Sequence, residues 1–305
     1  MTLTQTLLSF ARPEQVLTDE PMSRHTTFRA GGPAEILFQP ESEEQLLRAA
    51  RLAREYGVPL TVIGNGSNLL VKDGGIPGLT VRLGDFFSEI QVNGTEISAQ
   101  AGALLSRVSK TAQENGLAGL EFASGIPGSA GGGMAMNAGA YGGQLSDVAL
   151  RCRVINLKTL TVSEVPAEEM ALGYRTSAPL LSGDIVTLAV FRLQKGDPAA
   201  IQARMDDLNQ RRRDKQPLHL PSAGSTFKRP EGYFAGALIE QAGLKGVSVG
   251  GAQVSEKHAG FIVNAGGATG SDILSLISLV QSRVFERSGV RLETEVRVLG
   301  VDKAL

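Results

Sequence analysis

The chain carries, at residues 124–143, the stretch SGIPGSAGGGMAMNAGAYGG. So much glycine disfavours the interior of a helix or strand, because each glycine adds backbone entropy that folding must remove. Ile126, Pro127, Met134 and Met136 make the stretch too apolar for a solvated linker. A tract of this kind suits a backbone that lies close to a flat or charged group and offers it N–H groups. We therefore expect a nucleotide-like cofactor to bind here.

Length and composition indicate a soluble protein with more than one domain. The chain has 305 residues, above the usual size of one domain, and 42% of them are apolar. The formal net charge of −1 gives no field that would attract nucleic acid or an anionic membrane. The first twenty residues lack a signal-peptide pattern, and no apolar run reaches membrane-spanning length. We expect a cytoplasmic protein that binds neither nucleic acid nor membrane.

The side chains that most often form disulfides or hold metals are few and scattered. Cys152 is the only cysteine, and we expect it to be a small buried side chain. His25, His219 and His258 lie far apart and in no metal-ligand spacing, so we expect no metal site. The run Ser225-Thr226-Phe227-Lys228 matches the S-x-x-K motif of acyl-transfer enzymes, but the partner motifs S-D-N and K-T-G are absent. A hydrolase is therefore disfavoured.

A strand–helix–strand unit is predicted at residues 34–63. Ser42 would begin the helix, with Gln45 completing a capping box, and Gly57 and Pro59 would end it. The unit runs into the turn Gly64-Asn65-Gly66-Ser67-Asn68.

The turn at residues 64–68 is not a dinucleotide-binding fingerprint of the Rossmann type. Leu69 stands where that motif needs its third glycine, and loop residues follow where it needs a helix. The backbone amides of the turn, with the side chains of Ser67 and Asn68, still suit a phosphate group. The alternative is a tight turn between strands with no ligand.

Periodicity and turn residues predict alternating strands and helices along the rest of the chain. The strands are expected at 79–83, 90–92, 95–99, 148–157, 161–165, 184–193, 246–254, 260–264 and 290–299, and the helices at 104–115, 197–213, 234–242 and 272–287. Asn93-Gly94 is typical of a hairpin turn, and Asp197-Pro198 of a helix start. In the last strand, charged residues of both signs share one face, which is either a solvated sheet face or the wall of a polar cleft.

Several motifs, taken together and in order, resemble the family of UDP-N-acetylenolpyruvoylglucosamine reductase, the flavoenzyme of bacterial cell-wall precursor synthesis. The matching segments are 25–34, 64–71, 125–142, 173–177, 223–228, 244–252, 260–264 and 292–300. The resemblance implies an α+β fold. A two-lobed FAD-binding region of the PCMH type, not Rossmann, would occupy residues 1–78 and 79–215, and an α+β substrate-binding domain residues 216–305. Residues 176–183 lead almost directly into a strand, so the chain looks like the shorter type without a tyrosine-bearing loop.

The resemblance also implies the cofactors and the substrate. FAD would bind non-covalently, with its pyrophosphate on the turn at 64–68 and its isoalloxazine near the glycine tract, and NADPH would be the co-substrate. The substrate would be the enolpyruvyl ether of UDP-N-acetylglucosamine and the product UDP-N-acetylmuramate, a peptidoglycan precursor. No protein partner is implied. The residues that would hold FAD are Gly64, Asn65, Gly66, Ser67, Asn68, Gly125, Pro127, Gly128, Ser129, Asn137 and Gly139.

Three residues match the family's catalytic positions. Hydride addition to an unsaturated carboxylate moves negative charge onto the carboxylate, and Arg175 matches the arginine that would stabilise it. The carbon next to the carboxylate must then be protonated on one face, and Ser225 matches the family's proton donor. Glu295 matches the glutamate that would interact with the same carboxylate or assist proton delivery.

Basic residues beside the cleft would bind the substrate phosphates. Lys215, Lys228 and Lys245 occupy the matching positions. The family usually has asparagine directly after the lysine at position 228. Here Arg229 stands there, so a positive charge replaces an amide. Two other functions remain open from the sequence: a flavin oxidase with the same FAD-binding architecture, and a non-catalytic protein that binds a flavin or a nucleotide sugar.

Overall fold

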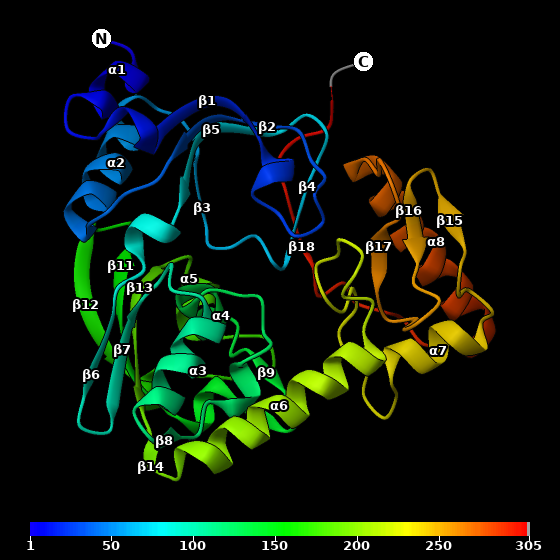
Figure 1. Cartoon of the computed structure of the whole chain (residues 1–305). Helices are drawn as coiled ribbons and strands as arrows, with labels where there is room; N and C mark the ends of the chain where they lie inside the picture. The colour runs from blue at the N-terminus through cyan, green and yellow to red at the C-terminus, as the bar shows by residue number, and fades with distance from the viewer. Residues whose placement is uncertain (304–305) are drawn as a thin grey trace. The chain divides into compact units, whose positions relative to one another are not determined.

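A computed structural model describes residues 1–303 of the chain (Figure 1). These residues form two compact units, each built from segments that are distant in the sequence. The first consists of 1–17, 36–65 and 78–211, and the second of 18–35, 66–77 and 212–305, of which 304 and 305 lie outside the described residues. The chain passes from the first unit to the second within the turn at 64–68, between Asn65 and Gly66.

Antiparallel strands dominate the first unit. Strands β12 (Thr161–Pro166), β11 (Ala149–Asn156), β13 (Ile185–Arg192), β7 (Glu96–Gln100) and β6 (Ile90–Asn93) form one sheet in that order, and helices α3 (Leu105–Glu114) and α4 (Ala130–Ala135) pack against it (Figure 1). The remaining elements are α1 (Leu3–Leu8), α2 (Glu43–Glu55), β3 (Leu60–Ile63), β8 (Leu117–Ala118), β9 (Gly139–Ala140), β10 (Gly143–Gln144), α5 (Ala178–Ser182), β14 (Gln194–Lys195) and α6 (Pro198–Lys215), whose last residues enter the second unit.

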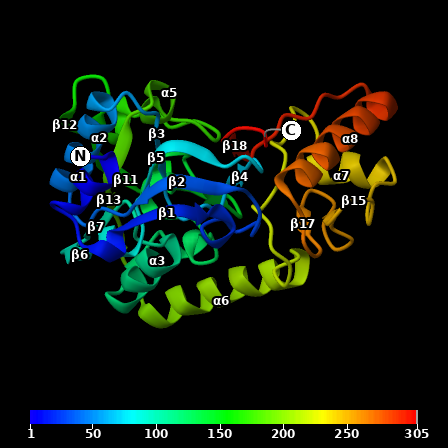
Figure 2. The same cartoon turned by 90° about the horizontal axis from the view of Figure 1, so that it is seen from above.

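The second unit has its own core beneath two helices. Helix α8 (Gly270–Ser288) packs against the sheet of β15 (Ser248–Val249), β16 (Ala252–Val254) and β17 (Ile262–Asn264), and helix α7 (Ala235–Gln241) packs against α8. Figure 2 shows the two helices side by side. Strand β18 (Arg297–Leu299) pairs in parallel with β4 (Leu69–Val71). Phe28, Ala30 and Leu70 belong to this core although they come from the first quarter of the chain.

Strands β1 (Val16–Pro21), β2 (Pro33–Phe38) and β5 (Ile76–Arg82) complete the fold. They form a four-stranded sheet with β3, in the order β1, β2, β5, β3, and β3 runs parallel to β5. The predicted strand–helix–strand unit at 34–63 is confirmed as β2, α2 and β3. Strand β1 has no clear apolar alternation, so no local pattern predicts it. It forms because it pairs with β2.

The expected exclusion of helix from the glycine tract is wrong. Residues 130–135 form α4 with three successive glycines inside it. A Cβ on Gly131 would lie 2.6 Å from the Ala101 Cβ, and one on Gly133 would lie 2.8 Å from a methyl carbon of Leu105. The helix therefore sits so close to its neighbours that only glycine fits, and the close packing offsets the entropy cost of ordering glycine.

The two C-terminal strands are also shorter than expected. The run 246–254 is two strands, because Gly250, at φ +52°, turns the chain between β15 and β16. Of the run 290–299, only β18 is a regular strand, and Thr294 makes an isolated bridge to Phe227. Burial still alternates at Leu292 and Val296, as the pattern predicted, but Val298 on the same expected face is exposed.

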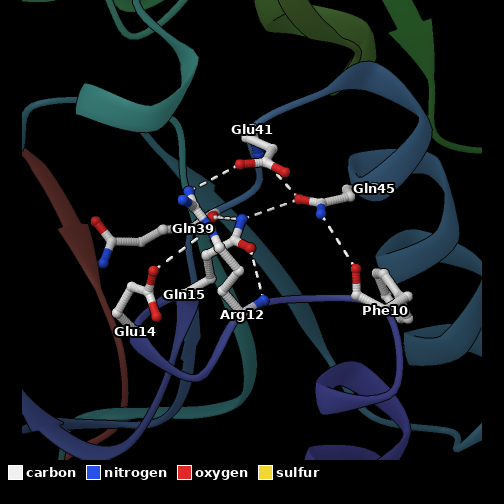
Figure 3. A network of polar contacts seen from close by, with 7 residues as sticks. All are labelled: Phe10, Arg12, Glu14, Gln15, Gln39, Glu41 and Gln45. Carbon is white, nitrogen blue, oxygen red and sulfur yellow. Dashed lines mark hydrogen bonds and ion pairs between the residues drawn. The ribbon is translucent and has the colours of Figure 1, made fainter.

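The capping box predicted for α2 is only half correct. The Ser42 hydroxyl accepts the Gln45 N–H, but the Gln45 side-chain oxygen accepts the Glu41 N–H instead of that of Ser42. Figure 3 shows why: Gln45 belongs to a network in which its amide also donates to the Phe10 carbonyl and accepts from Gln15. The network fastens the N-terminal segment to the start of α2. Cys152 is buried as predicted.

Candidate active site

The first half of the 64–68 turn lies against the glycine tract. The Asn65 amide donates a hydrogen bond to the Pro127 carbonyl at 2.6 Å. A Cβ on Gly64 would fall well inside van der Waals contact with the Ser129 hydroxyl oxygen. Four residues predicted to hold FAD, Gly64, Asn65, Pro127 and Ser129, therefore come together in the first unit.

Helix α4 presents one bare backbone face. Gly131 and Gly133 are buried, whereas Gly132 is exposed, and a Cβ there would meet only the Ser129 hydroxyl at 3.5 Å. The Gly128 carbonyl accepts the Leu105 N–H at 2.9 Å, which fixes the start of the helix. The α4 backbone is therefore accessible at Gly132, where no side chain stands between the helix and a flat group.

Asn137 joins the tract to the turn that carries Arg175. Its backbone adopts φ +44°, and its amide donates to the Gly173 carbonyl at 3.1 Å while its side-chain oxygen accepts the Ser146 N–H at 2.9 Å. The Ser177 hydroxyl donates to the Ala135 carbonyl at 2.7 Å. Both ends of the turn are therefore tied to α4 or to the residues that follow it. The Asn137 side chain shapes the tract through these bonds.

Arg175 occupies a strained position in a tight turn. The Gly173 N–H donates to the Thr176 carbonyl at 3.1 Å, and Arg175 itself has φ +57°, a conformation that L residues adopt rarely. Its guanidinium carbon lies 5.1 Å from the centre of the Tyr174 ring, within cation–π range. Strain at one arginine, held by bonds on both sides, is typical of a functional position. The remaining predicted residues of this unit, Gly125 and Gly139, are half-buried.

The second half of the turn belongs to the second unit, where it lies beside Glu295. Gly66 has φ +65°, and a Cβ on it would fall well inside contact with the His25 carbonyl oxygen. The Asn68 amide donates to the Glu295 carbonyl at 3.0 Å, and the Arg297 N–H donates to the Asn68 carbonyl at 3.0 Å. The structure therefore joins Asn68, from a predicted FAD turn, to Glu295, a predicted catalytic residue 227 positions away.

Ser225 and Glu295 lie on neighbouring, paired segments. The Glu295 N–H donates to the Thr226 carbonyl at 2.8 Å, and the Lys228 N–H donates to the Glu293 carbonyl at 2.8 Å. Thr226 is fully buried; its N–H donates to the Gly260 carbonyl at 2.9 Å and its hydroxyl accepts the Ile262 N–H at 3.0 Å. Ser225 itself is exposed. Bonds on both sides of Thr226 thus hold Ser225 at the surface next to Glu295.

The three predicted phosphate-binding lysines lie in exposed or half-exposed places in the second unit. Lys228 pairs with Glu293 at 3.1 Å and Lys245 with Glu240 at 3.0 Å. Lys215 is the last residue of α6 and is exposed. Ion pairs this exposed contribute little to stability, so these lysines can turn to an anionic ligand at small cost.

Comparison with known proteins gives the family. A model of the C-terminal domain of UDP-N-acetylenolpyruvoylglucosamine reductase matches residues 216–299, and a model of an FAD-binding domain matches residues 34–162. The UDP-N-acetylenolpyruvoylglucosamine reductase of Clostridium perfringens strain SM101 is 52% identical over 293 residues, which are 96% of each chain. The chain belongs to the UDP-N-acetylenolpyruvoylglucosamine reductase family.

Other members of this reductase family agree. The enzyme of Clostridioides difficile strain 630 is 50% identical over 97% of each chain. The crystal structure of the reductase from Thermus caldophilus superposes with a TM-score of 0.80 and 36% identity, covering 93% of this chain and 98% of that one. The predicted family and the α+β fold with an FAD-binding region followed by the reductase C-terminal domain are confirmed.

The residues around the 64–68 turn fit the FAD that the reductase family implies. The turn contains glycine, asparagine and serine and no carboxylate, which is the donor chemistry that a pyrophosphate needs. The Thr27 N–H donates to the Gly66 carbonyl at 3.3 Å, and the buried Thr27 hydroxyl oxygen has no hydrogen-bond partner within residues 1–303. A buried hydroxyl of this kind calls for a polar partner, and a cofactor group at the turn would supply one.

His258, which belongs to no motif in the sequence, lies near two of the predicted phosphate-binding lysines. Its ring accepts the Gly260 N–H at 3.1 Å and lies against Gly236 and Gly260. Burial, together with the charges of Lys245 and Lys215, holds the pKa of His258 below its usual value, against the opposing effect of its own backbone bond and of Glu240. Lys215 and Lys245 are therefore close enough to His258 to act on its charge. No spacing rule would have revealed this, because the three residues are brought together only by folding.

Two features are absent from the described part of the chain. Residues 1–303 contain no group of three or more His, Cys, Asp or Glu side chains that could hold a metal ion. Among the same residues, no helix combines the length and the apolar character that crossing a membrane would require.

Proposed function

We propose that this protein is an NADPH-dependent FAD reductase that converts the enolpyruvyl ether of UDP-N-acetylglucosamine into UDP-N-acetylmuramate, and that it acts in the cytoplasm in peptidoglycan precursor synthesis. The observation that carries the proposal is the identity of about half of all residues with reductases of that name, over 96% of both chains. These relatives favour neither the flavin oxidase nor the non-catalytic binding protein.

The proposed cofactor site uses backbone more than side chains. The turn at 64–68 would hold the FAD pyrophosphate, and the open face of α4, with Gly128 and Ser129 at its start, would lie against the isoalloxazine. FAD, when bound, supplies hydride transfer between NADPH and the enolpyruvyl C3. Support comes from the Asn65–Pro127 bond, which holds the turn against the tract, and from the unpaired hydroxyl of Thr27.

The proposed catalytic residues act on the substrate carboxylate and on the carbon next to it. Arg175 would bind the carboxylate, whose negative charge grows as hydride adds. Ser225 would then protonate C2, and Glu295 would interact with the same carboxylate or assist the proton. The pairing of the Ser225 and Glu295 segments through Thr226 supports a joint role. A serine is a weak acid, so proton transfer depends on exact placement, which the buried Thr226 provides.

The proposed binding of the diphosphate rests on Lys215, Lys228 and Lys245, all in the second unit. The proposed domains are 1–78 and 79–215 for FAD and 216–305 for the substrate. The match of the reductase C-terminal model to residues 216–299 supports the boundary after 215, and the match of the FAD-binding model to residues 34–162 lies within the proposed FAD region.

Half-reaction kinetics test the proposal. FAD-loaded protein is mixed with NADPH, and flavin bleaching is followed at its absorbance maximum; enolpyruvyl-UDP-N-acetylglucosamine is then added and reoxidation is followed. We expect Ser225→Ala to retain the first step and to lose at least about a hundredfold in the second, in the range of general acid catalysis. Ser275→Ala, an exposed serine on α8, is the matched control. A colourless wild-type protein that stays inactive with added FAD would disprove the proposal.

A further inference from the structure

One feature of the second unit has no role in the proposed reaction: an exposed aromatic loop immediately after the Ser225 segment. Tyr233 and Phe234 are 48% and 63% exposed. They follow Arg229, the residue that departs from the usual family motif. Single exposed aromatic residues are common, but two adjacent ones beside a cation are a candidate binding surface.

The loop is ordered by its own contacts. The Arg229 guanidinium carbon lies 4.0 Å from the centre of the Phe234 ring, and the Arg229 Nε donates to the Tyr233 carbonyl at 3.3 Å. The Tyr233 N–H donates to the Pro230 carbonyl at 3.1 Å, which closes a turn. Phe234 is the N-cap residue of α7. The ring is therefore held at the start of a helix with a guanidinium stacked on it, and it remains well exposed.

We propose that Arg229 and Phe234 form a stacking platform for the uracil ring of the nucleotide-sugar substrate. The inference rests on the proposed function. A nucleobase needs a flat, accessible π surface, and stacking on an aromatic ring is reinforced by a neighbouring guanidinium. The ordered loop offers this surface before the substrate arrives, so little conformational entropy is lost on binding.

The position of the platform fits the length of the substrate. Phe227 and Lys228 pair with the 293–294 segment, which fixes this part of the chain. The four residue steps from Ser225 to Arg229 span at most about 13 Å, the scale of a nucleoside diphosphate. Lys228 lies between the two ends. The segment thus presents a proton donor, a cation and an aromatic ring in the order in which the substrate presents enolpyruvyl ether, diphosphate and uracil.

The second unit offers a matched control pair. The Arg291 guanidinium carbon lies 4.6 Å from the centre of the Phe285 ring, and Phe285 is 43% exposed. The Arg291–Phe285 pair thus has the same chemistry as the Arg229–Phe234 pair. Phe285, however, lies in the last turn of α8 and is not on the segment that carries Ser225. Truncating Phe285 should therefore leave nucleotide binding unchanged.

Calorimetric titration of the FAD-loaded protein with UDP and, separately, with inorganic pyrophosphate tests the platform. We expect Phe234→Ala to weaken UDP binding about tenfold, as for loss of one base–aromatic stack, and to change pyrophosphate binding by less than twofold. Phe234→Trp should restore UDP affinity, and Phe285→Ala should match the wild type. In steady state, Phe234→Ala should raise the KM for the enolpyruvyl substrate and leave kcat near the wild-type value.

Several results would overturn the inference. UDP affinity of Phe234→Ala within twofold of the wild type, an equal loss for UDP and pyrophosphate, or an equal loss in Phe285→Ala would each do so. Turnover by the wild type is measured first. Absence of that turnover refutes the proposed function, whereas normal turnover with binding that is independent of Phe234 refutes the platform alone.

Discussion

Replacing Gly66 by alanine is expected to damage FAD binding far more than the same change at Gly94. Both glycines have left-handed backbones, with φ of +65° and +60°. That conformation costs an L residue about 1–2 kcal/mol, so this part of the penalty is shared. A Cβ at Gly94 meets open space, whereas one at Gly66 would run into the backbone carbonyl of His25. A backbone atom does not move aside as a side chain does, so the turn must shift.

The size of the difference follows from that shift. Relieving the overlap needs a movement of about 1 Å, and forced repacking of this kind costs about 1–3 kcal/mol. Gly66→Ala should therefore lose about 2–5 kcal/mol of unfolding free energy and Gly94→Ala about 1–2 kcal/mol. A shifted turn should also lose a hydrogen bond to a charged phosphate, worth about 1.5–3 kcal/mol, or about 10- to 150-fold in the FAD Kd.

The assay is a fluorescence titration of deflavinated protein with FAD, alongside urea unfolding of both variants. Gly94→Ala serves as the control because it carries the same backbone strain without the collision, and its FAD Kd should stay within about twofold of the wild type. The reasoning fails if the two variants bind FAD with the same affinity and unfold at the same urea concentration.

Three further predictions concern residues outside the reacting groups. Asp73 accepts bonds from the Gly270 N–H, the Ser271 N–H and the Ser271 hydroxyl at the start of α8; partial burial opposes its ionisation, but these bonds outweigh it and lower its pKa. A carboxyl whose pKa is lower in the folded than in the unfolded chain stabilises the fold at pH values above its unfolded pKa, so Asp73→Asn should cost about 1–2 kcal/mol at pH 7. The difference in urea midpoint between the variant and the wild type should shrink below about pH 4. A difference that stays constant down to pH 2.5 would contradict this. Thr226→Val leaves the buried Ile262 N–H without its acceptor and should cost about 1–3 kcal/mol of unfolding free energy. It should also lower kcat, because Ser225 is adjacent, whereas Thr226→Ser should retain the wild-type stability and kcat. Equal behaviour of the two variants would show that the hydroxyl is unimportant. Burial raises the pKa of the Cys152 thiol to about 12, so it should resist a thiol reagent at pH 8 until urea unfolds the protein; rapid labelling of the folded protein would count against this.

Local signals predicted most elements but few of their long-range partners. The hairpin at Asn93-Gly94 and the helix start at Asp197-Pro198 are confirmed, because each depends on residues adjacent in sequence. Helix α4 was excluded by its glycine content, which is a correct statement about an isolated segment and a wrong one for a segment packed tightly on Ala101 and Leu105. Tertiary packing overrides intrinsic helix propensity where burial and close contacts contribute more to stability than propensity does.

The predicted site residues show the same division. Motifs in the sequence predicted Asn68, Ser225 and Glu295 one by one, through the resemblance to the family. The bonds that join them, from the Asn68 amide to the Glu295 carbonyl and from the Glu295 N–H to the Thr226 carbonyl, are visible only in the folded chain. Thr226 and Asp73 carried no signal at all, since a buried threonine and a capping aspartate 197 residues from its helix match no local pattern.

The sequence by itself determined the family, the fold class and the types of residue available for the chemistry. Those properties reside in ordered short motifs and in glycines that no other residue can replace. Only the tertiary structure decided that residues 18–35 and 66–77 join the C-terminal unit, that the glycine tract contains a helix, and that Arg229 stacks on an exposed phenylalanine. The physical reason is range: turns and caps depend on neighbouring residues, whereas packing and burial depend on segments that meet only when the chain folds.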